Sequence, residues 1–339
     1  MQIEKLQAFD VSAKNSNIVQ IHGHEQPPVD EDYLQSLLIP EGIDFADYAE
    51  NRESEKDNIK TPRSFHDALI AALDKNSAVQ GASMPWTKTH EKIRFRDGEV
   101  TMWHGYSGHK KSMALGYVAL GFMQQNLPVC IASFEMQPVS TLSRMLKQAS
   151  GTTEPTAYAL EQFLNFTDSK LWLYDKQGTL TQETLFGVMY YAADKLGVKH
   201  FVIDSLMRVV PNEDDYNAQK NFVIKLCEIA KETGMHIHFV HHNRKGDESK
   251  EAGSQGAKGT GAIKDNVDNA IEVWTKYKTI DEKNLASKND AEVMELPDTY
   301  VICTKQRHGE WEGKIALWFD FGSLQFKGSR DAAVRTWVK

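Results

Sequence analysis

Short apolar runs alternate with longer amphipathic stretches along the chain from about residue 98. Seven runs have the length and the β-branched and aromatic content of strands: 99–104, 128–134, 170–175, 200–204, 236–242, 269–274 and 299–305. The first five are separated by stretches long enough for helices, and in one of these, 217–232, one face is formed by Phe222, Leu226, Ile229 and Ala230. This alternation predicts an α/β fold in which helices flank a mostly parallel, twisted sheet.

The two ends of the chain depart from this pattern. Residues 299–326 predict antiparallel strands with turns at His308-Gly309 and Phe321-Gly322. Residues 1–60 are polar, acidic and aperiodic, which indicates a weakly ordered tail or a docking segment. A helix is expected from Thr61, because Thr-Pro opens it and apolar residues then recur at helical spacing. The chain therefore divides into a tail (1–60), a linker helix region (61–90) and an α/β domain (91–339).

Composition narrows the class of protein. No apolar run approaches the roughly 18–20 residues that span a bilayer, and the first residues lack the basic start and apolar core of a signal peptide. The cysteines Cys130, Cys227 and Cys303 lie too far apart for a zinc site or a disulfide framework, which favours a reducing cytoplasm. The net charge of −8 argues against a protein that is basic all over, but it permits a basic surface confined to one loop.

A sequence close to a phosphate-binding loop follows the first expected strand. Gly105, Lys111 and Ser112 meet the pattern G-x-x-x-x-G-K-[ST], whereas Lys110 replaces the second glycine. In such loops backbone N–H groups bind phosphates, the lysine reaches the β- and γ-phosphates, and the hydroxyl ligates Mg²⁺. The predicted nucleotide contacts are Gly105, Ser107, Gly108, His109, Lys110, Lys111 and Ser112. The alternative is a glycine turn that only caps a helix.

Two carboxylates stand where expected strands end. Asp204 closes the strand 200–204 and is expected to hold the hydration shell of the Mg²⁺ that Ser112 ligates. Glu135 follows the strand 128–134 and could activate the water that attacks the γ-phosphate. Each has a structural alternative: Asp204 as a helix-capping residue, and Glu135 as a surface residue near a helix start at Pro138.

Polar residues also end the fifth expected strand. His241, His242 and Arg244 stand there, and a polar side chain at this place could sense the γ-phosphate and pass its state to the following loop. Metal binding by the histidines is a rival interpretation, although no nearby cysteine or acidic cluster completes a site. Exposed polar residues at a strand end are the third possibility.

Two further segments carry basic residues. The Gly-rich, mildly basic stretch after the fifth strand could track a nucleic-acid backbone through Lys258 and the amides near Gly259 and Gly261, although it has no aromatic residue for base stacking. An ordinary surface loop is the alternative. Lys305 and Arg307 stand at a strand end or hairpin and could enter a neighbouring subunit's nucleotide site, or they could be solvated residues of an edge strand.

The order of these motifs is more specific than any one of them. The series HGYSGHKKS, ASFEM, FVIDS, HFVHHNRK, GTGAIKDNVDNAIEVW and KQRHGEWEG resembles the RecA-like ATPase domain of DnaB-type ring helicases. It is most similar to the helicase half of phage primase-helicases and of Twinkle, over about residues 61–326. Nothing in the chain resembles the primase or zinc-binding domains of those proteins, so primer synthesis is not expected.

The resemblance implies roles for the candidate residues. Glu135 falls on the catalytic glutamate, Asp204 on the metal-associated aspartate, and His242 on the phosphate-sensing position. Lys305 and Arg307 match residues that reach across a subunit interface and act in catalysis. The stretch Gly259 to Ile263 falls on a DNA-binding loop that faces the channel of the ring, with predicted DNA contacts at Gly259, Thr260 and Gly261 and further ones at Lys258 and Arg244.

The function that the resemblance implies is replicative DNA unwinding. Such a chain forms a homohexamer, hydrolyses ATP (or dTTP) with Mg²⁺, and moves 5′ to 3′ on single-stranded DNA in the cytoplasm of a bacterium or a phage-infected host. A linker helix docks on the adjacent subunit, and a primase or a polymerase are further partners. Two alternatives stay open: a RecA-like DNA-dependent ATPase without unwinding, such as a recombination mediator or helicase loader, and a nucleotide-binding regulator that does not hydrolyse.

Lys110 is the main departure from the family pattern. If the position requires a positive φ, a non-glycine residue costs about 1–2 kcal/mol there, whereas micromolar nucleotide binding is worth roughly 8 kcal/mol. We therefore expect nucleotide binding to survive, and we expect Lys110 to add positive charge near the phosphates.

Overall fold

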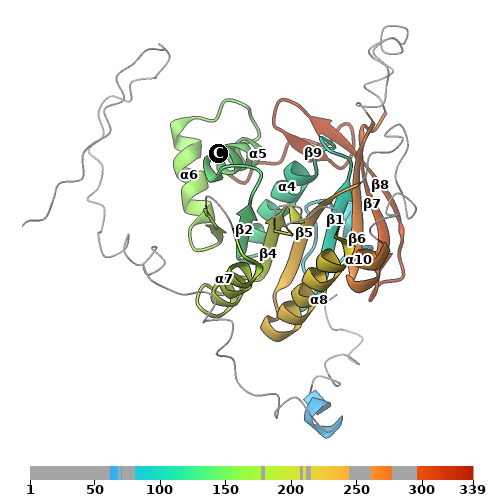
Figure 1. Ribbon diagram of the computed structural model, residues 1–339. Coiled ribbons are helices and arrows are strands. Elements are labelled where there is room, and N and C mark those ends of the chain that lie inside the picture. Colours follow the sequence, from blue (N-terminus) through green and yellow to red (C-terminus); the bar gives the residue numbers. More distant parts are fainter. Residues whose placement is uncertain are drawn as a thin grey trace, which may run out of the picture. The chain divides into compact units, whose positions relative to one another are not determined.

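The computed structural model describes residues 62–67, 70, 81–176, 180–206, 209–210, 215–243, 261–276 and 296–338 (Figure 1). The chain divides into two units, 1–43 and 44–339, and all described residues belong to the second. The predicted tail, residues 1–60, lies outside the described residues. The helix expected from Thr61 is observed in part. Pro62–Phe65 form the 3-10 helix η2, and His66, Asp67 and Ile70 are helical, whereas residues 71–75 lie outside the described part.

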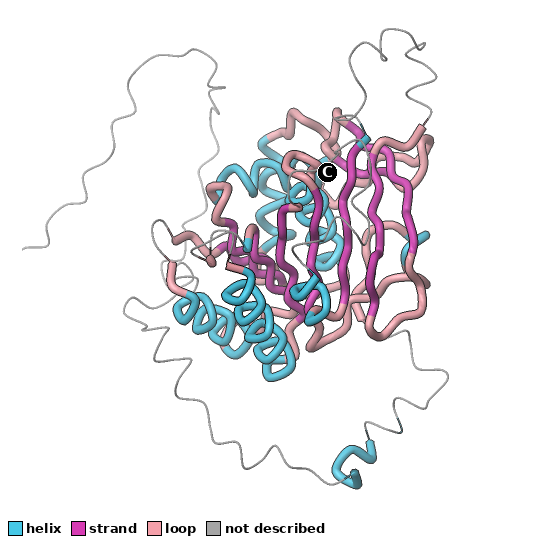
Figure 2. The backbone as a smooth tube through the Cα atoms, turned by 45° about the vertical axis from the view of Figure 1, so that its right-hand side comes forward, coloured by secondary structure: helices cyan, strands magenta, loops and turns pink. Residues whose placement is uncertain are grey.

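A sheet of nine strands forms the centre of the described domain, in the order β3-β2-β4-β5-β1-β6-β7-β8-β9. The strands are β1 Val100–Gly105, β2 Val129–Ser133, β3 Leu171–Leu173, β4 His200–Asp204, β5 His236–His242, β6 Asn269–Thr275, β7 Thr299–Gln306, β8 Gly313–Asp320 and β9 Gln325–Lys327. Strands β1 to β6 pair in parallel, and β7, β8 and β9 continue the sheet in antiparallel fashion. Figure 2 shows strands of this sheet side by side. The predicted fold class is confirmed, including the antiparallel strands near the C-terminus.

Helices cover both faces of the sheet (Figure 1). One apolar core joins the sheet to α4 (Lys111–Gln124), α5 (Pro138–Ser150) and α6 (Ala157–Thr167). A second core joins it to α7 (Gln182–Asp194), α8 (Tyr216–Thr233) and α10 (Gly261–Asn266). In β2, Val129 and Ile131 belong to the first core and Cys130 and Ala132 to the second, because successive side chains of a strand point to opposite faces.

The helix boundaries follow from local capping. The Asp215 side chain accepts a hydrogen bond of 2.9 Å from the N–H of Ala218 at the start of α8, and Gly234 ends that helix at φ 71°. The predicted apolar face of this helix is buried: Phe222, Leu226, Ile229 and Ala230 are at most 1% exposed. Among the described residues, no helix combines the length and the apolar character that crossing a membrane would require.

Residues that precede β1 pack onto the first core. Ala82 pairs with Phe95 in an isolated antiparallel bridge, and the side chains of Met84 and Trp86 are buried in the same core as α4. The short helix η3 (Thr87–Thr89) follows Trp86. This segment therefore supports the sheet face that carries α4, the helix that begins at the phosphate loop.

Candidate nucleotide site

Four motifs meet at the carboxyl edge of the parallel strands. Strands β2, β4, β5 and β1 are consecutive neighbours in the sheet. In the register of these pairs Ser133 lies beside Asp204, and Gly105 lies beside His242. Since the loops after parallel strands share one edge, the phosphate loop, the Glu135 segment, Asp204 and His242 form one site.

The phosphate loop depends on glycine at two positions. Gly105 has φ 147°, and a Cβ on it would lie 2.4 Å from the carbonyl oxygen of Val273 in β6. Gly108 has φ 76°, a conformation that residues with a Cβ rarely adopt. The loop thus turns tightly against β6 before α4 begins at Lys111, and Ser107 and Gly108 are exposed on it.

His109 anchors the loop to the neighbouring strand. Its ring is fully buried, Nδ1 accepts a hydrogen bond of 3.0 Å from the N–H of Thr275, and its carbonyl accepts one from the Thr275 hydroxyl. Its own N–H donates to the carbonyl of Tyr106. These contacts give His109 a role in the shape of the loop, and its contact with nucleotide stays a prediction.

Lys110 adopts the left-handed conformation that the pattern assigns to glycine, with φ 62° and ψ 23°. Its Nζ lies 4.5 Å from the centre of the Phe319 ring and 5.7 Å from that of Phe321. The aromatic pair at the end of β8 therefore holds this ammonium in the observed conformation, and its place near the phosphates stays a prediction. Cation–π attraction of about 0.5–2 kcal/mol offsets a comparable conformational strain.

Lys111, His242 and Glu135 form a chain of polar contacts across the edge. The ammonium of Lys111 donates to the carbonyls of Gly105 and Tyr106 at 2.9 and 2.8 Å, and it lies 3.3 Å from Nδ1 of His242. Because an ammonium only donates, Nδ1 accepts, and the proton is on Nε2. That Nε2 donates to Oε1 of Glu135 at 3.0 Å.

The same contacts set the protonation of Glu135. The hydrogen bond from His242 is the main cause that lowers the pKa of Glu135 to about 2, and it outweighs partial burial. The Ser205 hydroxyl donates to the same Oε1 at 2.6 Å and acts in the same direction. Glu135 is therefore ionised throughout the neutral range and a third of its side chain is exposed, which suits a group that orients a water molecule.

Asp204 stands behind the first turn of α4. Its side chain is 6% exposed, burial raises its pKa, and a hydrogen bond from Ser112 opposes that rise. Oδ1 of Asp204 is buried and makes no hydrogen bond with the described residues. A buried carboxylate oxygen beside a serine hydroxyl is the donor set that a hydrated Mg²⁺ takes, so Ser112 and Asp204 fit the predicted metal site.

Two residues that the sequence interpretation missed belong to this site. Ser205 orients Glu135, and its only sequence signal is its place directly after Asp204. Arg144 on α5 lines a cavity of about 30 Å³ together with Ser112 and Asp204, and the charge of Asp204 acts on its guanidinium. The cavity has room for about two water molecules.

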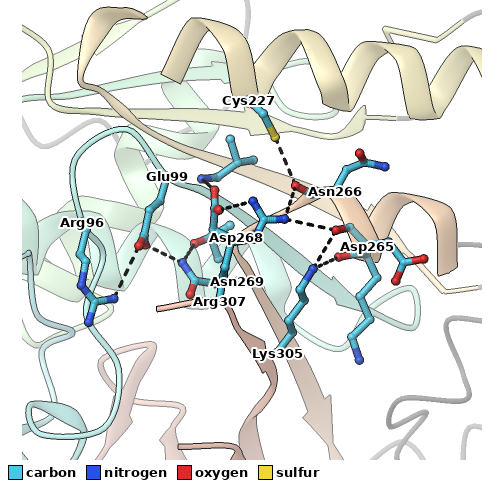
Figure 3. A network of polar contacts seen from close by, with 12 residues as sticks. Arg96, Glu99, Cys227, Asp265, Asn266, Asp268, Asn269, Lys305 and Arg307 are labelled. Atoms are coloured by element: carbon cyan, nitrogen blue, oxygen red, sulfur yellow. Dashed lines mark hydrogen bonds and ion pairs between the residues drawn. The ribbon is translucent and has the colours of Figure 1, made fainter. Parts of the chain in front are cut away.

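Lys305 and Arg307 lie at the opposite, amino edge of the parallel strands. Asn269, the first residue of β6, pairs with Gln306 of β7. Figure 3 shows both basic side chains directed at the carboxyl end of α10. The structure therefore does not bring them to the phosphate loop of their own chain.

Most of the predicted DNA-contacting residues lie outside the described part: Arg244, Lys258, Gly259 and Thr260. Gly261 begins α10, and Ile263 of this helix and Val267 just beyond its end are buried in the core shared with α8. His241 is buried and its pKa is lowered by burial to about 3. Among the described residues, no group of three or more His, Cys, Asp or Glu side chains is placed to hold a metal ion.

Comparison with known proteins agrees with this architecture. Residues 92–248 match the family model described as an AAA domain. A solved DnaB-like replicative helicase superposes with a TM-score of 0.63 at 12% identity, over 79% of this chain and 67% of that chain. The ATPase domain of G40P superposes with a TM-score of 0.64 at 13% identity, over 78% of this chain and 98% of that chain. Identities this low establish the fold alone.

The class of domain follows from these findings together. A mostly parallel sheet that carries a glycine turn, a lysine and a serine at the start of a helix is the arrangement of P-loop domains, and the two superpositions show that the fold is RecA-like. More narrowly, its fold is that of DnaB-type helicase ATPase domains, as the order of the motifs implied.

Proposed function

We propose that this chain is a ring-forming replicative DNA helicase that hydrolyses ATP (or dTTP). The observation that carries the proposal is the meeting of Lys111, Glu135, Asp204 and His242 at one edge of the sheet. Four independent motifs far apart in the sequence supply there a phosphate-binding cation, a metal-associated carboxylate, a water-orienting carboxylate and a sensor.

The chemistry follows from the chain's own residues. Lys111 leaves the carbonyls of its loop and binds the β- and γ-phosphates. Ser112 and Asp204 would hold Mg²⁺, which neutralises charge that develops on the phosphates. Glu135 accepts a hydrogen bond and then a proton from the attacking water, whose oxygen forms a bond to the γ-phosphorus while the bond to the β-phosphate oxygen breaks. Phosphoryl transfer requires mainly such positioning, so a carboxylate of low basicity suffices.

His242 links the γ-phosphate to this carboxylate. Its Nε2 proton serves Glu135 in the observed arrangement. If a γ-phosphate oxygen accepted the hydrogen bond from Nε2 in place of Glu135, the main cause of the lowered pKa of Glu135 would be removed. Glu135 would then become a better proton acceptor only when a triphosphate is bound.

Completion of the site requires a neighbouring subunit. Lys305 and Arg307 lie at the edge opposite to the phosphate loop, so they would serve the nucleotide of the next copy in a ring. A closed homohexamer with a docked linker helix supplies that geometry. The helix at Thr61 is the proposed linker, and residues 1–60 are the proposed docking tail.

The DNA contact is proposed for the stretch that precedes α10. Arg244, Lys258, Gly259, Thr260 and Gly261 would face a central channel, with translocation 5′ to 3′. The solved DnaB-like helicase is described with its primase interactions, which supports a primase as a partner here. A polymerase is a further proposed partner.

The deciding experiment combines strand displacement with assembly mass. The purified chain, with ATP and Mg²⁺, is given a forked duplex with either a 5′ or a 3′ single-stranded tail, and the Glu135→Gln variant is the matched control. Displacement that requires the 5′ tail and is lost in the variant supports the proposal, as does a hexamer mass with nucleotide. If DNA stimulates hydrolysis but no strand is displaced, the chain is a recombination mediator or a helicase loader. If nucleotide binds but is not hydrolysed, the chain is a nucleotide-binding regulator.

A further inference from the structure

The basic pair of β7 is held by its own chain at the carboxyl end of α10 (Figure 3). Nζ of Lys305 donates to the carbonyls of Lys264 and Asp265 at 2.7 and 2.9 Å. Nη2 of Arg307 donates to the carbonyls of Asp265 and Asn266 at 3.3 and 3.2 Å. Since the last carbonyls of a helix have no partner within it, two cations satisfy them here.

Asp268 completes this arrangement. Its Oδ1 forms an ion pair of 2.9 Å with Nη1 of Arg307, and its Oδ2 accepts a hydrogen bond of 2.9 Å from the N–H of Val100 at the start of β1. The Asp268 side chain is 6% exposed, whereas that of Arg307 is 40% exposed. The guanidinium is thus reachable from outside while its anionic partner is buried.

The two uses of Arg307 exclude each other. A guanidinium binds a phosphate with the same paired N–H groups that now bind Asp268 and the helix carbonyls. Departure of Arg307 would leave a buried carboxylate without its cation, which is strongly unfavourable unless the surroundings rearrange. The contact in cis and the contact in trans are therefore two alternative states.

Helix α10 connects this contact to the proposed DNA stretch. Gly261 begins the helix directly after Thr260, and Asn266 ends it after six residues. Ile263 and Val267 are fully buried against the α8 side of the core. Because close-packed interiors transmit strain, a displacement at the amino end of this short helix would reach the carbonyls that hold Lys305 and Arg307.

We propose that Asp268 and the carboxyl end of α10 form a latch that holds Lys305 and Arg307 in cis until DNA displaces α10. Asp268 is a positioning residue that acts through Arg307. The inference rests on the proposed function, because the released pair would complete a neighbour's nucleotide site. DNA would then stimulate hydrolysis by opening the latch. For this, DNA must bind the open state more tightly than the closed state, since a ligand shifts an equilibrium between two states only through its different affinity for them.

The chain contains its own reporter of the latch. The thiol of Cys227 on α8 donates to the carbonyl of Asn266 across 3.5 Å, the same carbonyl that Arg307 binds. Burial raises the pKa of Cys227 to about 11, so the thiol reacts slowly while α10 stays in place. Cys130 and Cys303 are at most 3% exposed and serve as internal references when labelled peptides are separated by mass spectrometry.

The test measures Cys227 alkylation and ATP hydrolysis in the full-length chain, each with and without single-stranded DNA. Asp268→Asn keeps an acceptor for the Val100 N–H but removes the charge that holds Arg307. We expect this variant, without DNA, to be alkylated and to hydrolyse ATP at least about fivefold faster than the parent, with a smaller stimulation by DNA. Arg307→Gln should raise alkylation equally but abolish hydrolysis. Glu228→Gln, which breaks the exposed pair with Lys225 on α8, is the matched control and should change neither.

Alkylation and DNA-independent hydrolysis that stay within about twofold of the parent in Asp268→Asn overturn the latch. If Asp268→Asn fails to fold, unchanged Cys227 alkylation in Arg307→Gln overturns it equally. A parent chain without ATPase, in which both variants still raise alkylation, supports the contact in cis and refutes the helicase function instead.

Discussion

Glu135 and His242 are joined by a hydrogen bond of 3.0 Å although β4 lies between their strands in the sheet. The bond spans the carboxyl edge because Glu135 lies beyond the end of β2 and His242 is the last residue of β5. With Lys111 on the other ring nitrogen, the histidine has one donor and one acceptor position, both in use. A change at the γ-phosphate, or at the water beside Glu135, can therefore be transmitted through this one imidazole.

Glu135→Gln should bind nucleotide but lose turnover. The amide can still accept a hydrogen bond, but it carries no charge and takes no proton, so the hydrolysis rate should fall about 10²–10⁴-fold. Nucleotide affinity, measured by fluorescence titration with a labelled analogue, should stay within about tenfold of the parent. A variant with the parent's full ATPase rate would remove Glu135 from the catalytic role.

His242→Ala should raise the pKa of Glu135. Removal of the imidazole takes away the main cause of its lowered value, and the Ser205 hydroxyl remains. The carboxylate should then protonate at a higher pH than the present value of about 2. The side-chain carboxyl resonance of ¹³C-labelled glutamate, followed from pH 2 to 6, measures the shift. Ser205→Ala is the comparison and should give a smaller rise, whereas a larger rise in Ser205→Ala would reverse the assigned order of causes.

Lys110→Gly should leave nucleotide affinity within about tenfold of the parent, or roughly 1.4 kcal/mol. The change relieves about 1–2 kcal/mol of left-handed strain and removes a cation–π contact of about 0.5–2 kcal/mol, so the two effects oppose each other. Lys110→Ala loses the contact and keeps the strain, so it should lower the free energy of unfolding by about 0.5–2 kcal/mol in urea titrations. A phosphate site made more than tenfold tighter by Lys110→Gly would show that the natural loop is impaired.

The sequence predicted the strands, the α8 face and the edge that gathers Glu135, Asp204 and His242, because hydrophobic period and motif order report these directly. It did not predict the direction of the Lys110 side chain, since the aromatic pair Phe319 and Phe321 lies about 200 residues away in the chain. For the same reason Arg307 could be recognised as a basic residue near a turn, but its ion pair with Asp268 depends on how β6 and β7 pair. Contacts between distant segments carry no local pattern.

Gly105→Ala should damage the phosphate loop. The added Cβ would meet the Val273 carbonyl oxygen at 2.4 Å, and the backbone has φ 147°. We expect the free energy of unfolding to fall by more than about 2 kcal/mol and nucleotide binding to be lost. Gly116→Ala in α4 is the matched control, because its nearest neighbours are 3.7 Å away and the helix gains up to about 1 kcal/mol. Equal unfolding midpoints for the two variants would contradict the close packing of the loop on β6.

Three neutral histidines lie in the first core, beneath α4. Phe122 stacks on His200 with ring centres 3.9 Å apart, and His200 and His238 share a hydrogen bond of 3.1 Å. His236 donates from Nδ1 to the carbonyl of Arg96, so its Nε2 accepts from the Thr101 hydroxyl. Burial lowers the pKa of all three, that of His236 to about 3.

Stability should therefore fall as the pH drops below about 6.5. A histidine whose pKa is lowered by folding binds its proton more readily in the unfolded chain, so its contribution is complete above the unfolded value of about 6.5 and is lost toward the folded value. For His236 the loss of stability at pH 5 is about 2 kcal/mol relative to pH 8.

The variant His236→Gln tests this prediction, because it keeps a donor for the Arg96 carbonyl and an acceptor for the Thr101 hydroxyl but cannot titrate. Urea unfolding at pH 8 and pH 5 should show a smaller loss in this variant than in the parent. Burial raises the pKa of the nearby Glu99, which favours the folded state as the pH falls, but this effect is the same in the parent and in the variant. Equal losses in parent and variant would mean that His236 is not held neutral by the fold.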